Sequence, residues 1–173
     1  YDTSGEAENT KMPGLQYKYQ ETVLILATNQ CAMYCRHCFR KRLVGINSKE
    51  TIERFEDAAA YIKKHNHINN VLISGGDPLI LKNEVIEKLL SILSKLPQIK
   101  FIRFGTRAPV TFPSRFKDKN LLQILSTYSL PDRRIYVITQ FNHPKEITPQ
   151  SDKAIDNLIS SGIIVNNQSV LLK

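Results

Sequence analysis

The hydrophobic and polar positions along the chain fall into two alternating kinds of segment. Residues 22 to 28 form a continuous apolar run with the length of a parallel strand that is covered on both faces. Farther along, residues 53 to 64 mix apolar and charged positions at helical spacing, and Ser48 can serve as the N-cap before them. A second short apolar run follows at residues 70 to 74. The pattern predicts a strand, a helix and another strand in succession.

The same alternation continues toward the end of the chain. The pattern predicts three further helices, at residues 84 to 96, 118 to 126 and 149 to 161, and three further strands, at residues 99 to 104, 134 to 139 and 163 to 166. Strands that alternate with helices imply right-handed crossovers and a parallel sheet, either doubly wound or closed as a barrel. We count five strands, and residues 169 to 172 offer a sixth.

The loops after the strands decide between these two architectures. Each of the five strands is followed by a polar or glycine-rich loop, at residues 31 to 38, 74 to 77, 105 to 107, 140 to 143 and 167 to 168. Loops of this kind at one rim are typical of a barrel mouth. We therefore expect an α/β fold, a partial (β/α) TIM-type barrel of about five to six βα units over residues 21 to 173, truncated at its C-terminal end. Residues 1 to 20 are polar and lack periodicity, so an extended arm over the surface is expected there.

Composition narrows the class of protein. The 173 residues are 42% hydrophobic and 23% charged, as in an ordinary globular domain. No run approaches the ~18 apolar residues of a membrane helix, and the N-terminus lacks the order of a signal peptide, so we expect a cytoplasmic protein without a membrane partner. The net charge of +8 attracts anions. RNA binding would also need exposed aromatics among the basic residues, and most aromatics here fall in apolar runs, so no nucleic-acid partner is predicted.

Three cysteines occupy eight residues with the spacing C-x3-C-x2-C, at Cys31, Cys35 and Cys38. An odd and compact set cannot form paired structural disulfides. Cysteine thiolates are the usual ligands of iron-sulfur clusters, and three thiolates on four irons leave one iron open to a chelating ligand. A structural zinc site of these cysteines with His143 is the alternative. It is less favoured, because zinc sites more often combine two separated pairs of ligands.

This cysteine spacing after a first barrel strand is similar to the hallmark of radical SAM enzymes. Five ordered blocks within residues 13 to 173 also resemble the lysine 2,3-aminomutase family: CAMYCRHCFRKRLVG, SGGDPL, RFGTRAPV, QFNHPKEIT and NQSVLL. The resemblance implies that the cysteines hold a 4Fe-4S cluster, which cleaves S-adenosylmethionine (SAM) reductively to methionine and a 5'-deoxyadenosyl radical. It further implies an isomerase acting on lysine or a related amino acid, with an electron donor such as flavodoxin or ferredoxin, and it leaves a homo-oligomer open.

The resemblance also assigns ligand-binding roles to residues at the strand ends. SAM would contact His37, Ser74, Gly75, Gly76, Asp77, Thr106, Arg107, Gln140 and Gln168, and Arg40 would receive the substrate carboxylate. The chemistry suits these roles: His37 would lie against the adenine, Asp77 would face the methionine ammonium, and amides can both donate to and accept from ribose hydroxyls. An arginine such as Arg40 can bind a carboxylate through two parallel hydrogen bonds. The family commonly has a histidine where Gln140 stands.

Several of these residues also have a purely structural interpretation. A Gly-Gly-Asp sequence often forms a plain strand-to-helix turn. Beside a ligand cysteine, a histidine such as His37 lies near the site whatever its role. Arg107 could equally be a solvated surface arginine. The neighbouring Lys41 and Arg42 are interpreted as surface charges.

Pyridoxal phosphate is the second cofactor of the aminomutase family, and its site is incomplete in this sequence. Two arginines usually bind the cofactor phosphate, and their places are taken by Lys18 and Thr22. Lysine binds phosphate as a point charge, whereas threonine adds no charge. The family's pyridoxal-binding lysine and the acidic residues for the substrate's distal ammonium would follow Lys173. Two alternatives therefore stay open: a radical SAM protein of the same family without pyridoxal phosphate, and a non-catalytic metal-binding module for zinc or redox chemistry.

Overall fold

A computed structural model of the chain describes residues 5 to 46 and 49 to 171. It contains one seven-stranded sheet in which the order of the strands is their order in the sequence. The strands are β1 (Thr10–Met12), β2 (Leu15–Tyr19), β3 (Thr22–Thr28), β4 (Asn70–Gly75), β5 (Phe101–Gly105), β6 (Arg134–Thr139) and β7 (Ile164–Asn167). Strands β3 to β7 are parallel, and β1 and β2 join the edge of β3 antiparallel. This arrangement confirms the expected α/β partial barrel with five parallel strands.

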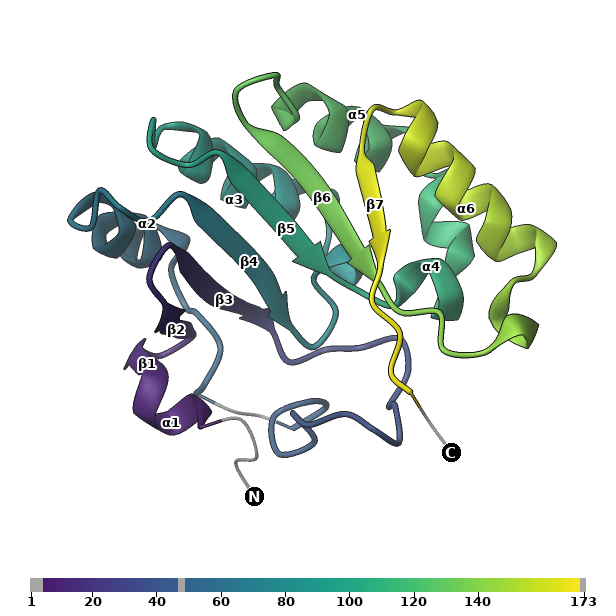
Figure 1. The fold of residues 1–173 in the computed structure, drawn as a ribbon, viewed down its shortest axis with the longest axis horizontal. Helices are drawn as coiled ribbons and strands as arrows, with labels where there is room; N and C mark the ends of the chain where they lie inside the picture. The colour runs from purple at the N-terminus through teal and green to yellow at the C-terminus, as the bar shows by residue number, and fades with distance from the viewer. Residues whose placement is uncertain (1–4, 47–48, 172–173) are drawn as a thin grey trace.

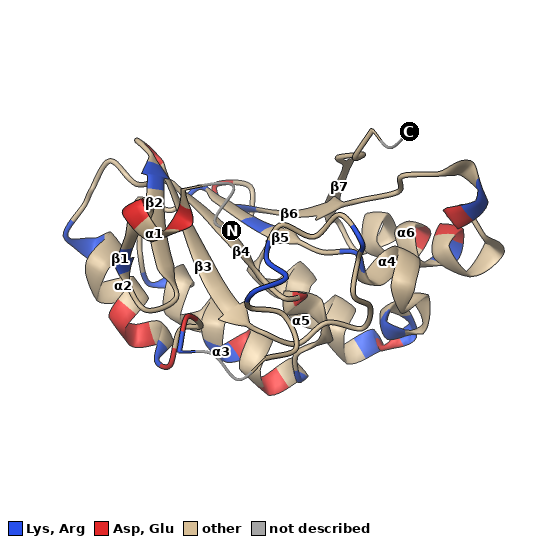
Figure 2. Cartoon of the chain, turned by 90° about the horizontal axis from the view of Figure 1, so that it is seen from below, with Lys and Arg blue, Asp and Glu red and all other residues tan. Residues whose placement is uncertain are grey.

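Helices connect the parallel strands along one face of the sheet. The helices are α1 (Glu6–Asn9), α2 (Phe55–Lys63), α3 (Asn83–Ser94), α4 (Ala108–Thr111), α5 (Lys119–Tyr128) and α6 (Pro149–Ser160), with 3-10 turns η1 (Pro78–Ile80), η2 (Pro113–Lys117) and η3 (Pro144–Glu146). Seen from two directions, α2, α3, α5 and α6 lie on the same outer side of a curved sheet (Figures 1 and 2). None of the helices among the described residues is long and apolar enough to cross a membrane.

The main hydrophobic core lies between the sheet and these helices. Val71 and Ile73 of β4 and Phe104 of β5 are fully buried there. Side chains alternate along a strand, so the residues between them, such as Leu72 and Arg103, face the opposite side. That inner face is less covered and carries polar groups. The sheet thus has a packed outer face and an inner face that is available to ligands.

The predicted elements agree with the structure except near the two ends of the described chain. Strands β3 and β6 have the predicted bounds, and the other parallel strands and the main helices differ by one to three residues. The predicted sixth strand is wrong in its described part, because residues 168 to 171 have no strand conformation. Ser48, the predicted N-cap, lies outside the described residues; helix α2 begins after Arg54 instead.

The N-terminal segment departs further from its prediction. Instead of an arm over the surface, residues 10 to 19 form β1 and β2, and Leu15 pairs with Ile25 and is fully buried. The backbone N–H of Leu26 donates to the carbonyl of Gly14 at 2.8 Å. Without this segment, one edge of β3 would expose unpaired backbone groups. The segment is short and mostly polar, so its sequence gave little sign of this pairing.

Candidate functional site

A cavity of about 320 Å³ lies at the carboxyl ends of the parallel strands. The loop between β3 and α2 runs beneath these ends (Figure 1). The cavity is lined by every residue to which the resemblance assigned a cluster, SAM or substrate-carboxylate role: Cys31, Cys35, His37, Cys38, Arg40, Ser74, Gly75, Gly76, Asp77, Thr106, Arg107, Gln140 and Gln168. The structure therefore brings together side chains from five successive strand ends. Which ligand each of them contacts stays a prediction.

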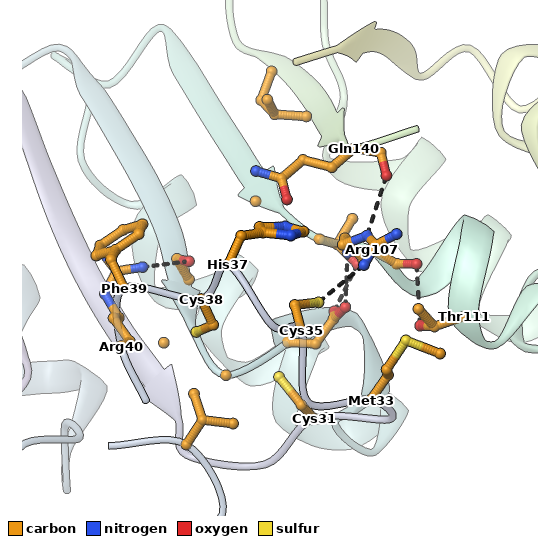
Figure 3. Close-up of a pocket in the computed structure, with 18 of the residues that line it drawn as sticks. Cys31, Met33, Cys35, His37, Cys38, Phe39, Arg40, Arg107, Thr111 and Gln140 are labelled. Atoms are coloured by element: carbon orange, nitrogen blue, oxygen red, sulfur yellow. Dashed lines mark hydrogen bonds between the residues drawn. The ribbon is translucent and has the colours of Figure 1, made fainter. Parts of the chain in front are cut away.

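The three cysteines come from the loop that follows β3. All three are partly buried free thiols, and Cys35 lies beside Arg107 at the cavity wall (Figure 3). Burial, reinforced by the Asp77 carboxylate and the other two thiols, raises the pKa of Cys31 to about 12. A bound metal reverses this effect, because a coordinated thiol is deprotonated. Among the described residues, no three His, Cys, Asp or Glu side chains converge on a point that would hold a single ion. A cluster that takes each thiolate on a different iron does not require such convergence.

Two glycines fasten the end of β4 to the start of the cysteine loop. The backbone N–H of Gly76 donates to Thr28 at 2.6 Å, and that of Asp77 donates to Gln30 at 2.7 Å. A Cβ atom on Gly75 or Gly76 would overlap the carbonyl oxygen of Thr28 or Gln30, respectively. Gly75 also has φ +116°, a conformation that favours glycine. The glycines thus serve a close approach of two backbone segments, and this approach fixes the residue that precedes Cys31.

Asp77 joins the ends of β4 and β5 and is only 5% exposed. Its Oδ1 accepts hydrogen bonds from Thr106 Oγ1 at 2.6 Å and from the Leu79 N–H at 3.1 Å, and its Oδ2 accepts one from the Arg107 N–H at 2.9 Å. Burial raises the pKa of Asp77, and these hydrogen bonds oppose the rise. A carboxylate has about four acceptor positions, so one remains on Oδ2. Asp77 therefore braces the turn and can still accept one further hydrogen bond from a cationic ligand.

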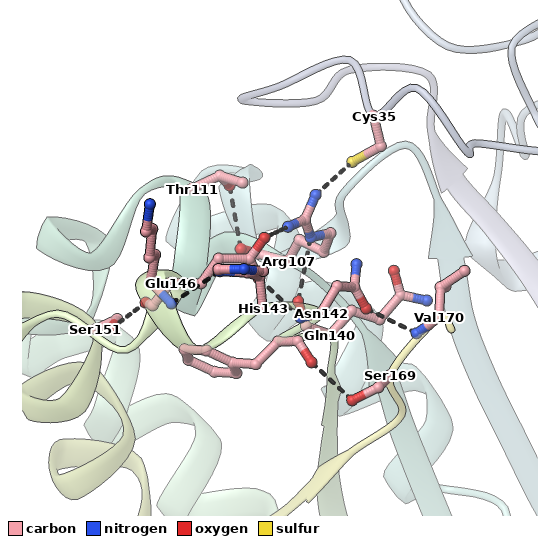
Figure 4. Close-up of polar contacts among 12 residues, drawn as sticks. Cys35, Arg107, Thr111, Gln140, Asn142, His143, Glu146, Ser151, Ser169 and Val170 are labelled. Atoms are coloured by element: carbon pink, nitrogen blue, oxygen red, sulfur yellow. Dashed lines mark hydrogen bonds and ion pairs between the residues drawn. The ribbon is translucent and has the colours of Figure 1, made fainter. Parts of the chain in front are cut away.

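Arg107 connects the cysteine loop to the turn after β6. Its Nη1 lies 3.0 Å from Cys35 Sγ, its Nη2 donates to Glu146 Oε1 at 2.9 Å, and its Nε donates to the Gln140 carbonyl at 3.2 Å (Figures 3 and 4). Burial lowers the pKa of Arg107, but Cys35 and Glu146 outweigh it and raise the pKa overall. The guanidinium is therefore held as a cation with its Nη1 directed at a cysteine sulfur.

Arg40 is held at the other side of the cavity by an acidic residue from α1. Its Nε donates to Glu6 Oε1 at 2.8 Å, and its Nη1 donates to Ser74 Oγ at 3.3 Å. Arg42 binds the second oxygen of Glu6 at 2.9 Å. Glu6 is 4% exposed, so two cations surround a buried carboxylate. The interpretation of Arg42 as a plain surface charge is therefore wrong, because the arginine takes part in this buried cluster.

His37, Gln140 and Gln168 complete the cavity wall. The Nε2 atom of His37 is buried and has no hydrogen-bond partner among the described residues. A buried polar atom without a partner indicates a position that a ligand atom can satisfy. Three thiols, this imidazole and the amides of the two glutamines form a donor set that fits a cluster with SAM beside it. The residues present thus suit the group that the cysteine motif implies.

Three residues considered from the sequence lie outside the cavity. His143 is exposed and its Nδ1 accepts from the Lys145 N–H, so it does not join the cysteines in a zinc site. Lys18 is near the end of β2 and Thr22 begins β3, whereas the cysteines follow the opposite end of β3. Six steps along a strand amount to about 20 Å. Neither Lys18 nor Thr22 lines the cavity.

Sequence reasoning missed the two acidic residues that hold the arginines. Glu6 lay in the segment expected to be a free arm. Glu146 belongs to the block QFNHPKEIT, but nothing in its local pattern connected it with Arg107, which is 39 residues away. The only available signal was general: two arginines near a buried site need acidic partners to compensate their charge.

Comparison with known proteins identifies the class. The family model of the radical SAM superfamily matches residues 25 to 173, and with the barrel and the cysteine loop this shows that the chain belongs to that superfamily. Within it, the chain is similar to lysine 2,3-aminomutases. It is 47% identical to a protein of Aquifex aeolicus over 96% of this chain and 44% of the relative. It is 43% identical to the L-lysine 2,3-aminomutase of Methanococcus maripaludis over 99% of this chain and 39% of that enzyme.

A relative that is named for another amino acid matches at a comparable level. The glutamate 2,3-aminomutase of Clostridioides difficile is 37% identical over 99% of this chain and 40% of that enzyme. The chain thus spans less than half the length of the curated relatives it matches. Similarity over this region shows the family and does not distinguish between the two amino acids.

Proposed function

We propose that this chain forms the cluster- and SAM-binding part of an amino acid 2,3-aminomutase. The observation that carries the proposal is the convergence of the three cysteines with Ser74 to Asp77, Arg107, Gln140 and Gln168 on one cavity. Its volume of about 320 Å³ lies within the usual range of small-molecule sites. The position at the carboxyl ends of barrel strands is where enzymes of this architecture act. The similarity to enzymes that bear the aminomutase name supports the same reaction.

The bound cofactors would supply one electron and a radical, because a 4Fe-4S cluster with an open iron cleaves SAM reductively. The residues of the chain would bind and orient. Cys31, Cys35 and Cys38 would each ligate one iron. Asp77, already accepting three hydrogen bonds, would offer its remaining acceptor position to an ammonium group. The unpaired His37 Nε2 would receive a hydrogen-bond partner from the adenine side of SAM.

Arg40 is our candidate for the substrate carboxylate. Glu6 and Ser74 engage its Nε and Nη1, and among the described residues Nη2 is left with two unused N–H donors. A guanidinium whose other edge is fixed loses less rotamer freedom when it binds an anion. Glu6 therefore pre-orients the group that would bind an amino acid. The identity of the amino acid would depend on residues that contact its side chain.

The proposal is tested by anaerobic reconstitution of the natural full-length chain with iron and sulfide. We expect the protein to hold four irons per three thiolates, and to release 5'-deoxyadenosine from SAM when dithionite is added. Single Ala variants of Cys31, Cys35 and Cys38 should lose iron and visible absorbance together. His143→Ala is the matched control, because this histidine lies outside the cavity and should leave iron content unchanged. An intact cluster without SAM cleavage would leave only a metal-binding module, and loss of metal in His143→Ala would favour zinc.

A second candidate function is radical SAM chemistry without pyridoxal phosphate. The position of Lys18 and Thr22 at the far end of β3, outside the cavity, favours it. An enzyme that uses the cofactor should show a visible absorbance band that borohydride removes, and its aminomutase activity should depend on added pyridoxal phosphate. Turnover of an amino acid without the cofactor would support the second candidate.

A further inference from the structure

Arg107 contacts the sulfur of Cys35, and this contact is separate from the SAM-binding role that the resemblance implies for the arginine. All three kinds of nitrogen in the guanidinium are engaged by the protein: Nε by Gln140, Nη1 by Cys35 and Nη2 by Glu146. The arginine is thus held on both sides, and one N–H points at a sulfur atom that is a predicted cluster ligand. The side chain is only 14% exposed. Little water therefore competes for the contact.

Glu146 is fixed in its own turn, so it can hold the arginine in place. Its Oε2 accepts from the Asn142 N–H at 2.8 Å, and its backbone N–H donates to His143 at 3.0 Å (Figure 4). Ser151 at the start of α6 donates to the Glu146 carbonyl at 2.8 Å. Glu146 is thereby anchored twice, its carboxylate by the turn after β6 and its backbone carbonyl by the next helix. Figure 4 shows the chain of contacts running from Ser151 through Glu146 and Arg107 to Cys35.

We propose that Arg107 donates a hydrogen bond to the Cys35 ligand sulfur and raises the reduction potential of the cluster, and that Glu146 is the positioning residue that maintains this bond. The inference rests on the proposed function only in requiring a cluster on these cysteines. When the cluster accepts one electron, negative charge on its sulfur ligands increases. A hydrogen-bond donor stabilises the reduced form more than the oxidised form, and hydrogen bonds to the sulfurs are among the factors that set such potentials.

The direction in which the reduction potential changes when Glu146 is replaced distinguishes its positioning role from the effect of its charge. A carboxylate near the cluster disfavours reduction through space, so its neutralisation alone should raise the potential. If Glu146 acts by holding Arg107, its loss should free the arginine, break the bond to sulfur and lower the potential. A glutamine has one carbonyl oxygen for two donors, Arg107 Nη2 and the Asn142 N–H, so Glu146→Gln cannot keep both contacts. Glu146→Asp keeps the charge but withdraws the carboxylate from the arginine.

The experiment is an EPR-monitored redox titration of the reconstituted full-length protein without SAM, with dithionite as reductant. We expect Arg107→Gln, Glu146→Gln and Glu146→Asp each to lower the potential, with about a tenfold smaller equilibrium constant for reduction, or 59 mV for one electron. Arg103→Gln is the matched control for charge, because Arg103 lines the same cavity but its Nε binds Asn70. It should lower the potential by less than Arg107→Gln does. Iron content and absorbance must match those of the parent protein.

Each possible result of the redox titration bears on a specific part of the proposal. A higher potential in Glu146→Gln, or an unchanged one in Glu146→Asp, would overturn the positioning role. An equal decrease in Arg103→Gln and Arg107→Gln would overturn the hydrogen bond to sulfur, because charge alone would then explain both. Failure of the parent protein to assemble a cluster would overturn the proposed function and this inference together. A well-formed cluster whose reduction potential is unchanged in both Glu146 variants would overturn this inference alone.

Discussion

Replacing Gly76 with alanine tests whether the close approach of two loops controls the cluster site. An added Cβ would overlap the Gln30 carbonyl oxygen and lie 2.6 Å from its carbonyl carbon. Carbon atoms pack at about 3.5 to 4.0 Å, so one backbone segment must move by about 1 Å. The obstructing atoms belong to backbone, and no side-chain rotation can relieve the overlap.

The loss of stability caused by this movement can be estimated from the hydrogen bonds at the two segments. The movement would break the hydrogen bonds from Gly76 to Thr28 and from Asp77 to Gln30. Each such bond contributes roughly 0.5 to 1.5 kcal/mol, so their loss should reduce the free energy of unfolding by about 1 to 3 kcal/mol. Gln30 immediately precedes Cys31, so the same movement should displace the first thiol and lower the iron retained after reconstitution.

Gly105→Ala provides the matched control. A Cβ at Gly105 would meet its nearest neighbour, Ser74 Oγ, at 3.5 Å, which is an ordinary contact. Denaturant unfolding and iron analysis should therefore give nearly parental values for Gly105→Ala and reduced values for Gly76→Ala. Equal stability and iron content in the two variants would refute the reasoning, because the approach at Gly76 would then have no structural consequence.

Three further predictions follow from the site. Asp77→Ala should weaken SAM binding measured by calorimetry while leaving the cluster assembled; iron loss as complete as in the cysteine variants would make Asp77 a purely structural brace. Lys18 with Thr22 should bind pyridoxal phosphate about tenfold to a hundredfold more weakly than an arginine pair, since a lost charged hydrogen bond is worth roughly 1.5 to 3 kcal/mol. This chain alone should therefore lose the cofactor on gel filtration, and stoichiometric retention would contradict the prediction. In the apo protein, the raised pKa of Cys31 keeps its thiol protonated, so its alkylation rate should still increase about tenfold per pH unit above pH 9. Mass spectrometry can follow this rate, and a plateau below pH 10 would contradict the pKa of about 12.

The parallel sheet and the edge at which the site lies could both be predicted from the pattern of apolar and polar residues. Runs of mostly apolar residues with the length of a strand identified β3 and β6 with their observed bounds, although only one face of each strand is fully packed. Parallel strands bring all their carboxyl ends to one edge, so the loops after them had to meet. For this reason residues as distant in sequence as Cys31 and Gln168 could be assigned to one cavity.

The pairing of the charged groups and the position of the N-terminal segment could not be predicted from the sequence. Glu6 is 34 residues from Arg40, and Glu146 is 39 residues from Arg107, so no local spacing connects either pair. The segment that forms β1 and β2 is short and mostly polar, and its strands exist because the edge of β3 offers partners for their backbone groups. Hydrophobic patterning specifies which residues are buried in an element. Ion pairs and edge pairing depend on which elements become neighbours, and that is settled only when the chain packs.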